Sequence, residues 1–191
     1  MGVYQLAIRR RTIRRFQDRK VPAEVLDKCL NAARLAASAA NLQPLEYIVV
    51  DDEAMLEQIF PALQWAVYIR PAGIPPEGKR PRAYIFIIQN QELSRPASVH
   101  DVGIAAAYMM LVALDEGIGS CPIVGMDRQI LQPLLKVPTN YEIPMVLALG
   151  YPDESPVAEP FTGSVQYWKD DKGVLHVPKR GLEGLRHHNT F

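Results

Sequence analysis

The sequence predicts a three-layer α/β/α sandwich, from its length and from the order of its apolar segments. The chain has 191 residues, which is close to the usual size of one domain. Short apolar runs of strand character alternate with segments of helical spacing, and the last forty residues are polar and rich in turns. We therefore expect one α/β or α+β domain over residues 1–191 that ends in an extended C-terminal tail.

The first half of the chain is predicted to run helix, turn, strand, helix. Pro22 suits the first turn of a helix whose apolar positions keep helical spacing from Leu26 to Ala37. The β-rich run Glu46–Val50 predicts a short strand, and Asp51-Asp52 is expected to cap a second helix. Residues 61–82 are rich in Pro and Gly, which predicts a long exposed excursion that could cover a pocket.

The second half is predicted to contain two buried strands and a long central helix. Ala83–Ile88 and Pro144–Leu149 read as strands, and a short helix interrupted by proline is expected after Asp127. Between them, residues 96–116 predict a helix that ends at Gly117. This helix is rich in Gly and Ala, which permit close approach of another helix, so we interpret it as a candidate dimer element.

Composition and charge favour a soluble cytoplasmic protein without a metal. The formal net charge is zero, although seven of the 21 basic residues lie in the first twenty positions. Cys29 and Cys121 are far apart and lack the spacing of a zinc site, which fits a reducing compartment. The longest apolar runs are too short to cross a bilayer, and no segment resembles a signal peptide.

Two segments together indicate a flavin mononucleotide (FMN) site. The arginine cluster Arg9–Phe16 offers fixed positive charge and forked donors that suit a phosphate. The small polar turn Ala37–Pro44 offers backbone and amide groups that can line a polar ring. A phosphate at one end and a ring at the other describe FMN.

These segments also resemble the two N-terminal signatures of the nitroreductase family of flavoproteins. Later segments resemble further signatures of that family in the expected order: Asp101–Ala105, Gly117–Gly125 and Ile143–Pro152. The resemblance implies the α+β nitroreductase fold and a homodimer with FMN at the subunit interface. It also implies that NAD(P)H reduces the flavin, which then passes electrons to a second substrate.

The resemblance assigns roles to the basic residues. Arg10 and Thr12 match positions that hold the FMN phosphate or ribityl chain, and Arg11 would contribute mainly through its backbone. Arg14 matches a cation near the flavin N1/O2 edge, where it would stabilise the negative charge of the reduced flavin. Near the C-terminus, the pair Lys179-Arg180 resembles one that closes over the phosphate.

The polar turn and a backbone segment would line the ring. Ser38 and Asn41 would approach the ring and the ribityl chain, and Gln43 would bond ribityl hydroxyls. The run Pro122, Ile123, Val124 and Gly125 resembles the family segment on the flavin face, where the Val124 N–H would face N5. No side-chain general acid is then required.

The function expected from this resemblance is an FMN oxidoreductase that takes hydride from NAD(P)H and reduces a nitroaromatic, quinone or enone in a ping-pong cycle. Gly-x-Gly-x-x-Gly after a strand is absent from the sequence, so NAD(P)H would visit the flavin site. Two alternatives stay open. One is a specialised reaction of the same fold, such as reductive dehalogenation or flavin fragmentation, and the other is a non-catalytic protein that binds flavin or nucleic acid.

Gln64 and the excursion around residues 65–82 bear on specificity. Gln64 is a weak substitute for polar residues that some family members place between their second and third signatures. The 65–82 excursion is expected to decide which substrate is accepted. Lone aromatics such as Trp65, Tyr68 and Tyr167 are interpreted as packing residues, and Asp101 as a cap or dipole partner of the long helix.

Overall fold

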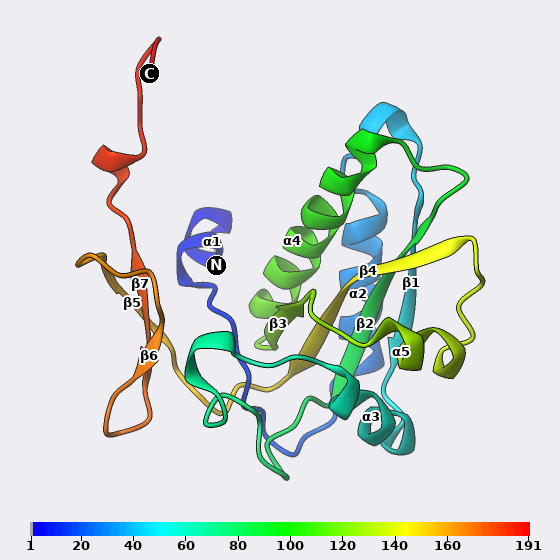
Figure 1. Cartoon of the computed structure of the whole chain (residues 1–191), viewed down its shortest axis with the longest axis horizontal. Coiled ribbons are helices and arrows are strands. Elements are labelled where there is room, and N and C mark those ends of the chain that lie inside the picture. The colour runs from blue at the N-terminus through cyan, green and yellow to red at the C-terminus, as the bar shows by residue number, and fades with distance from the viewer. Residues whose placement is uncertain (1) are drawn as a thin grey trace.

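A four-stranded antiparallel sheet forms the centre of the computed structural model, which describes residues 2–191 (Figure 1). Its strands are β1 (Leu45–Val50), β2 (Ala83–Asn90), β3 (Gly119–Ile123) and β4 (Tyr141–Gly150), in the spatial order β1-β2-β4-β3. Each neighbouring pair is antiparallel. The sheet therefore belongs to the α+β class, and β3 is one of its two edges.

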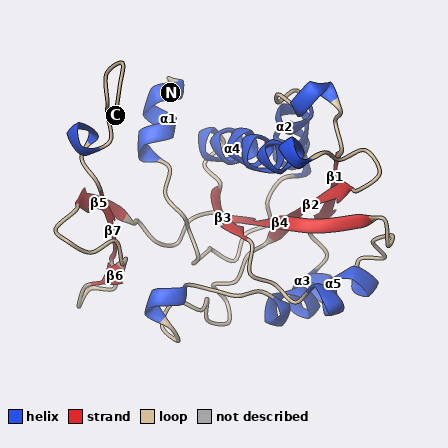
Figure 2. Cartoon of the chain, turned by 45° about the horizontal axis from the view of Figure 1, so that its top comes forward, coloured by secondary structure: helices blue, strands red, loops and turns tan. Residues whose placement is uncertain are grey.

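Helices cover both faces of this sheet (Figure 2). Helices α2 (Ala23–Arg34) and α4 (Val99–Asp115) pack on one face, and α3 (Glu53–Ile59) and α5 (Arg128–Leu134) lie on the other. The alternation within β2 divides the core, because Tyr84, Phe86 and Ile88 face α3 while Ala83, Ile85 and Ile87 face α4. The predicted α/β/α sandwich is confirmed.

Most predicted helices begin or end at the capping residues that the sequence indicates. Pro22 is the N-cap of α2, and the Asp52 carboxylate caps α3 by accepting the Met55 N–H at 3.0 Å. Helix α4 ends before Gly117, whose φ of 77° is left-handed. Helix α2 ends at Arg34 and not at Ala37, because the chain turns there toward the polar segment.

The sequence analysis missed helix α1 (Val3–Arg9) and strand β3. Helix α1 buries Leu6, ends at Arg9 and packs against α4. Strand β3 contains Pro122 and begins at Gly119, and both residue types normally signal a turn. Proline is tolerated here because β3 is an edge strand, where a missing N–H on the outer side breaks no ladder bond.

The excursion over residues 61–82 is irregular, as predicted, but it is pinned to the body. Trp65 is buried and stacks on Phe60 with ring centroids 5.4 Å apart, and the Arg80 guanidinium lies 4.2 Å from the same Phe60 ring. Arg82 forms ion pairs with Asp18 at 3.1 Å and Glu53 at 2.8 Å. The interpretation of Trp65 as a packing residue is therefore confirmed.

The arginine segment docks on the edge formed by β3 and β4. The Ile13 N–H donates to the Ser120 carbonyl at 3.0 Å. Gly119 and Gly150 are partners in the β3–β4 register, and the side chains of Ile13 and Phe16 occupy the space above them. A Cβ at Gly119 would lie 2.8–3.0 Å from Ile13, and one at Gly150 would lie 2.8 Å from Phe16. Two glycines therefore let the segment approach the sheet.

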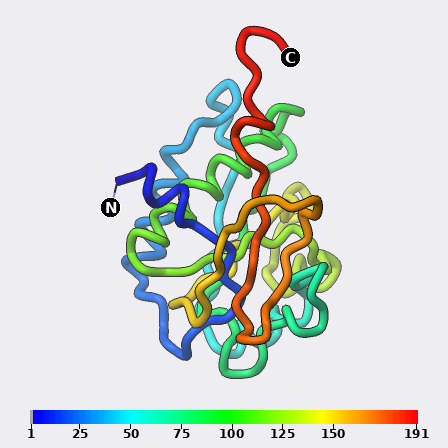
Figure 3. Tube along the Cα trace, turned by 90° about the vertical axis from the view of Figure 1, so that its left-hand side faces the viewer, coloured from blue at the N-terminus to red at the C-terminus, as the bar shows by residue number. Residues whose placement is uncertain are grey.

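The tail forms a small second sheet and then leaves the body (Figure 3). Its strands are β5 (Val157–Pro160), β6 (Trp168–Lys169) and β7 (Leu175–Lys179), in the order β5-β7-β6. Leu175 is buried against the body, whereas residues 180–191 are exposed. The predicted extended tail is thus correct only beyond β7.

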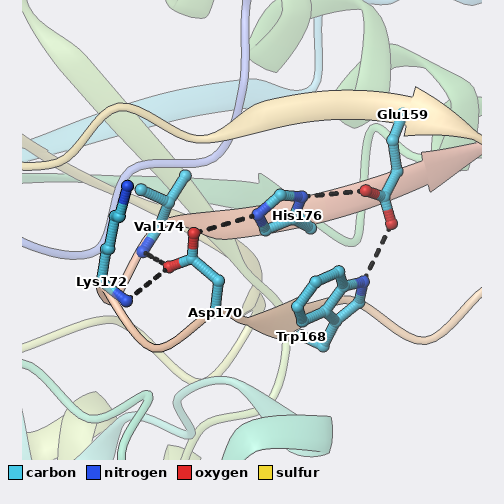
Figure 4. A network of polar contacts seen from close by, with 6 residues as sticks. All are labelled: Glu159, Trp168, Asp170, Lys172, Val174 and His176. Atoms are coloured by element: carbon cyan, nitrogen blue, oxygen red, sulfur yellow. Dashed lines mark hydrogen bonds and ion pairs between the residues drawn. The ribbon is translucent and has the colours of Figure 1, made fainter.

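His176 on β7 holds this small sheet together (Figure 4). Its Nδ1 lies 2.8 Å from Glu159 and its Nε2 lies 3.5 Å from Asp170. Its ring stacks on Trp168 at 4.2 Å, and the Trp168 Nε1–H donates to Glu159 at 2.9 Å. The hydrogen bonds from Trp168 and His176 lower the pKa of Glu159. The Asp170 pKa is also lowered, because bonds from the Val174 N–H and from His176 outweigh its burial.

We expect Gly119→Ala to destabilise the protein by about 1–3 kcal/mol, because the new methyl group overlaps the branched side chain of Ile13. Urea unfolding followed by circular dichroism measures this change. Gly184→Ala is the matched control, because a Cβ there meets nothing within 4 Å. Equal stability of the two variants would show that Ile13 does not need the space above Gly119.

We expect the tail sheet to loosen in acid. Both Glu159 and Asp170 have a lowered pKa in the folded state, so their contribution is present above the ordinary carboxylate pKa of about 4 and is lost as the pH falls below it. Trp168 emission in a Trp65→Phe background should report the change before circular dichroism shows global unfolding. A Glu159→Gln variant should lose most of this pH dependence, and an identical titration in both proteins would contradict the assignment.

Candidate functional site

A cavity of about 490 Å³ opens between the arginine segment and the tail sheet. Its polar lining comes from Arg10, Arg11, Thr12, Arg14 and Lys179, and its apolar lining from α1, Leu175 and Val177. Among its lining residues, all of which lie in the described part of the chain, there is no carboxylate. The sequence prediction that Arg10–Arg14 and Lys179 share one site therefore agrees with their placement.

The cations of this cavity lack an anionic partner. Burial lowers the pKa of Arg10, and the neighbouring charge of Arg11 lowers it further. The Nε of Arg11 is buried without a hydrogen bond, and its Nη1 donates only to the Arg10 carbonyl at 2.6 Å. A bound phosphate would supply acceptors for such groups and would relieve their mutual repulsion. The donor set thus fits the phosphate of a cofactor.

The two C-terminal basic residues are placed differently. Lys179 is the last residue of β7 and lines the cavity. The Arg180 Nη2 donates instead to the Gly184 carbonyl at 2.9 Å, within the exposed tail. The structure therefore brings Lys179 to the arginines and does not bring Arg180 there.

The arginine segment that lines this cavity docks on the outer edge of β3. Because Ser120 uses its carbonyl to accept the Ile13 N–H on that side, alternation along the strand directs the backbone groups of Pro122 to the same side. Pro122 has no N–H, and Val124 is 56% exposed. Ile123 points inward and is buried in the core. Val124 follows the end of the strand, and its carbonyl accepts the Arg128 Nη2–H at 3.3 Å. Within one chain, Val124 lines a second hollow together with Gly103 and Arg128, and not the basic cavity.

Gln64 lies against the end of this edge. Its N–H donates to the Gly125 carbonyl at 2.9 Å, and its side chain packs over Gly125, where a Cβ would meet Oε1 at 2.8 Å. The sequence analysis named Gln64 only as a weak candidate. The structure places it beside the Val124–Gly125 segment.

Tyr167 and Tyr68 form an aromatic wall next to Arg14. The Arg14 guanidinium lies 5.1 Å from the centre of the Tyr167 ring, which is within range of a cation–π contact. Tyr68, in the short helical turn Val67–Ile69, meets Tyr167 edge-on at 5.0 Å. Through Tyr68, the 61–82 excursion thereby contacts Tyr167, which lines the cavity.

A buried carboxylate holds the polar turn. Asp101 in the first turn of α4 is 3% exposed and accepts the Ser38 hydroxyl at 2.7 Å and the Ala39 N–H at 2.9 Å. The Ser38 Oγ also accepts the Gln43 N–H at 2.9 Å. The interpretation of Asp101 as a cap of α4 is wrong, because its carboxylate accepts bonds from the neighbouring turn, whereas its place in the first turn of α4 agrees with the alternative of a dipole partner. Sequence spacing contained no signal for this contact across 63 positions.

The turn carries unusual backbone conformations and exposed amides. Ala40, Asn41 and Gln43 have φ values of 50°, 53° and 50°, which are uncommon for residues other than glycine. The side chains of Asn41 and Gln43 are exposed, whereas the Ser38 hydroxyl is engaged within the turn. Strained backbone of this kind persists where surrounding contacts hold it, and it gathers at functional sites.

The two halves of the predicted site lie far apart within one chain. Ser38 contacts Asp101 near the start of α4, whereas Arg10 contacts Met110, nine residues further along the helix. At 1.5 Å per residue this spacing corresponds to about 13 Å along the axis. Figure 1 shows the light-blue turn and the blue arginine segment toward opposite ends of α4. One chain alone does not join Arg10 with Ser38, Asn41 and Gln43.

The described acidic, histidine and cysteine residues do not favour metal or thiol chemistry. Within residues 2–191, no group of three or more His, Cys, Asp or Glu is arranged to hold a metal ion. Burial raises the pKa of both Cys29 and Cys121 to about 11. Neither thiol is therefore suited to act as a nucleophile at neutral pH.

Comparisons with known proteins agree with this architecture. A Thermotoga neapolitana iodotyrosine deiodinase is 30% identical over 166 residues, which are 80% of this chain and 89% of that protein. A Thermus thermophilus NADH dehydrogenase is 29% identical, covering 78% of this chain and 85% of its own length. The crystal structure of an FMN-dependent nitroreductase from Clostridium difficile superposes with a TM-score of 0.71 at 29% identity, covering 97% and 98% of the two chains. The family model for nitroreductases matches residues 7–151, and this chain belongs to the nitroreductase family.

Proposed function

We propose that this protein is an FMN-dependent oxidoreductase that accepts hydride from NAD(P)H and reduces a small electrophile. The observation that carries the proposal is the carboxylate-free basic cavity, which is lined by the arginine segment that docks on the outer edge of β3. Arg10, Arg11 and Lys179 in its lining fit a phosphate, and the Val124 N–H beyond the end of that strand would be the backbone donor to the ring. Membership of a family that includes an FMN-dependent nitroreductase and an NADH dehydrogenase supports the same function.

FMN would be held by the basic residues at one end and by backbone at the other. Bound FMN supplies an atom, N5, that accepts hydride and later gives it up. Arg10, Arg11, Thr12 and Lys179 would bind the phosphate and ribityl chain, and Arg14 would stabilise negative charge near N1. The Val124 N–H would orient N5 without changing protonation state. A ping-pong cycle follows if NAD(P)H and the electrophile use one pocket in turn.

A second copy of the chain would complete the site. The turn that carries Ser38, Asn41 and Gln43 lies near the other end of α4 from Arg10, so a homodimer packed along α4 would bring one chain's turn to its partner's cavity. The surface of α4 suits this contact. Small residues Gly103 and Ala107 are exposed beside the large residues Val99 and Tyr108.

The hydropathy of α4 agrees with a covered helix. The segment Pro96–Asp115 is long and apolar enough to cross a membrane by length and composition, with a mean hydropathy of 1.6, and only 39% of that stretch is buried. Its buried side packs on α2 and the sheet, as in the core helix of a soluble protein. We therefore assign its uncovered apolar side to the dimer and not to lipid.

Reductive dehalogenation is a second candidate. The observation that favours it is the 30% identity to an iodotyrosine deiodinase over most of both chains. The aromatic wall of Tyr68 and Tyr167 beside Arg14 would suit an aromatic substrate that carries a negative charge. Iodide release from 3-iodo-L-tyrosine, with chemically reduced protein, separates this reaction from the reduction of nitroaromatics or quinones.

We expect the purified protein, loaded with FMN, to show a flavin absorption band that bleaches when NADH or NADPH is added without oxygen. Bleaching would establish cofactor binding and hydride acceptance together. A band that persists with both donors, yet bleaches with dithionite, would favour the specialised or non-catalytic alternatives. Absence of any flavin spectrum change on titration with FMN would contradict the proposed function itself.

Complementation between two inactive variants tests the composite site. Arg10→Ala/Thr12→Ala should weaken the phosphate half, and Asn41→Ala/Gln43→Ala should weaken the turn. Each homodimer should bind FMN weakly. After unfolding and refolding of an equal mixture, random pairing leaves about a quarter of the sites with both halves intact. FMN fluorescence quenching measures this recovery, and no recovery above the separate variants would show that both halves act within one chain.

A further inference from the structure

Glu154 is a buried carboxylate directly behind the basic cavity. It follows β4, and its side chain is 10% exposed. Its Oε1 accepts the Arg14 N–H at 2.6 Å and the Arg15 N–H at 3.3 Å. The adjacent Asp153 N–H donates to the Arg15 carbonyl at 2.9 Å. Glu154 therefore holds the backbone N–H groups of Arg14 and Arg15, between the backbone bonds of Ile13 to Ser120 and of Phe16 to Lys79.

Several cationic side chains surround the single carboxylate of Glu154. Its nearest cationic atom is the Lys169 Nζ at 4.0 Å, and Arg14 and Arg15 line the same small space. Burial lowers the pKa of Lys169, and the charge of Arg15 lowers it further. This space shares Arg14 and Leu175 with the basic cavity. A charge on Glu154 thus acts on the cavity across a single layer of side chains.

The contacts of Glu154 separate two roles. Because Glu154 accepts two backbone N–H groups, it fixes the position of the Arg14 backbone. An amide oxygen could accept the same two bonds. Because it is ionic and poorly exposed, it also offsets the positive potential that Arg14, Arg15 and Lys169 produce. A carboxylate is needed only for the second role.

We propose that Glu154 is a positioning residue for Arg14 whose negative charge also limits how strongly the site favours reduced flavin. The proposal rests on the proposed function, because it requires FMN in the basic cavity. Arg14 and Lys169 favour the negative charge that arrives with reduction, and Glu154 opposes it. The balance sets the reduction potential at which the protein exchanges electrons with its two substrates.

The test measures the reduction potential of the FMN bound to each variant, relative to a reference dye. Glu154→Gln keeps an acceptor for both N–H groups and removes one negative charge, so the ratio of reduced to oxidised flavin at a fixed dye ratio should rise about three- to tenfold. Lys169→Met and Arg14→Gln should each shift this ratio in the opposite direction. Glu154→Ala should in addition weaken FMN binding, because it frees the Arg14 backbone.

Asp153→Asn is the matched control. Asp153 is the neighbouring carboxylate, but its side chain is 34% exposed and pairs with Lys79 at 2.8 Å, away from the cavity lining. Its removal should leave the flavin ratio unchanged. A wild-type ratio in folded, FMN-loaded Glu154→Gln would overturn the proposal, and so would an equal rise in Asp153→Asn.

The outcomes also separate this proposal from the proposed function. Failure of the wild-type protein to bind FMN is seen before any variant is made and defeats the proposed function. If Glu154→Gln does not fold, Lys169→Met still decides, because an unchanged or increased ratio there contradicts a charge balance behind Arg14. Normal FMN binding with no charge-dependent shift in either variant refutes only the role of Glu154.

Discussion

The docking of residues 10–16 on the β3–β4 edge is the contact on which the site depends. It requires an unusually close approach, which Gly119 and Gly150 permit by leaving room for Ile13 and Phe16. The hydrogen bond from Ile13 to Ser120 then sets the register of the segment. This register places Arg10 and Arg14 at the cavity and leaves the next part of the β3 edge open. The phosphate end and the ring end of the proposed cofactor site are thus aligned by one strand.

The two buried carboxylates of the site act on backbone and not on substrate. Asp101 holds the Ser38–Ala39 turn, and Glu154 holds the Arg14–Arg15 backbone. A carboxylate is a strong acceptor for N–H groups, and burial keeps water from competing for those bonds. Arg14 lines the cavity while Glu154 lies behind it, and Asp101 supports the turn toward the other end of α4. Such an arrangement keeps positive charge available to a phosphate without leaving the surrounding backbone unsupported.

In the proposed homodimer, helix α4 would link cofactor binding to assembly. One end of the helix adjoins the arginine segment, and the other adjoins the polar turn, so a single copy presents two incomplete halves. Its exposed face alternates small and large apolar residues, which suits packing against a second helix. In the proposed homodimer, the loss of the helix contact and the loss of FMN affinity would therefore accompany each other. The same constraint explains why the motifs, although close in sequence, are not neighbours in one chain.

The sequence by itself determined the layered architecture, because alternation in β2 and helical spacing elsewhere are local patterns that burial enforces. It also determined the concentrated positive charge of Arg10–Arg14, since fixed charge in a short segment needs no distant partner. Only the tertiary structure decided that Gly119–Ile123 is an edge strand, that Arg180 turns away, and that Asp101 and Glu154 support the site. These features depend on contacts between residues far apart in the chain, such as Glu154 and Arg14 across 140 positions. No periodicity encodes such pairings, because the packing of the whole sheet creates them.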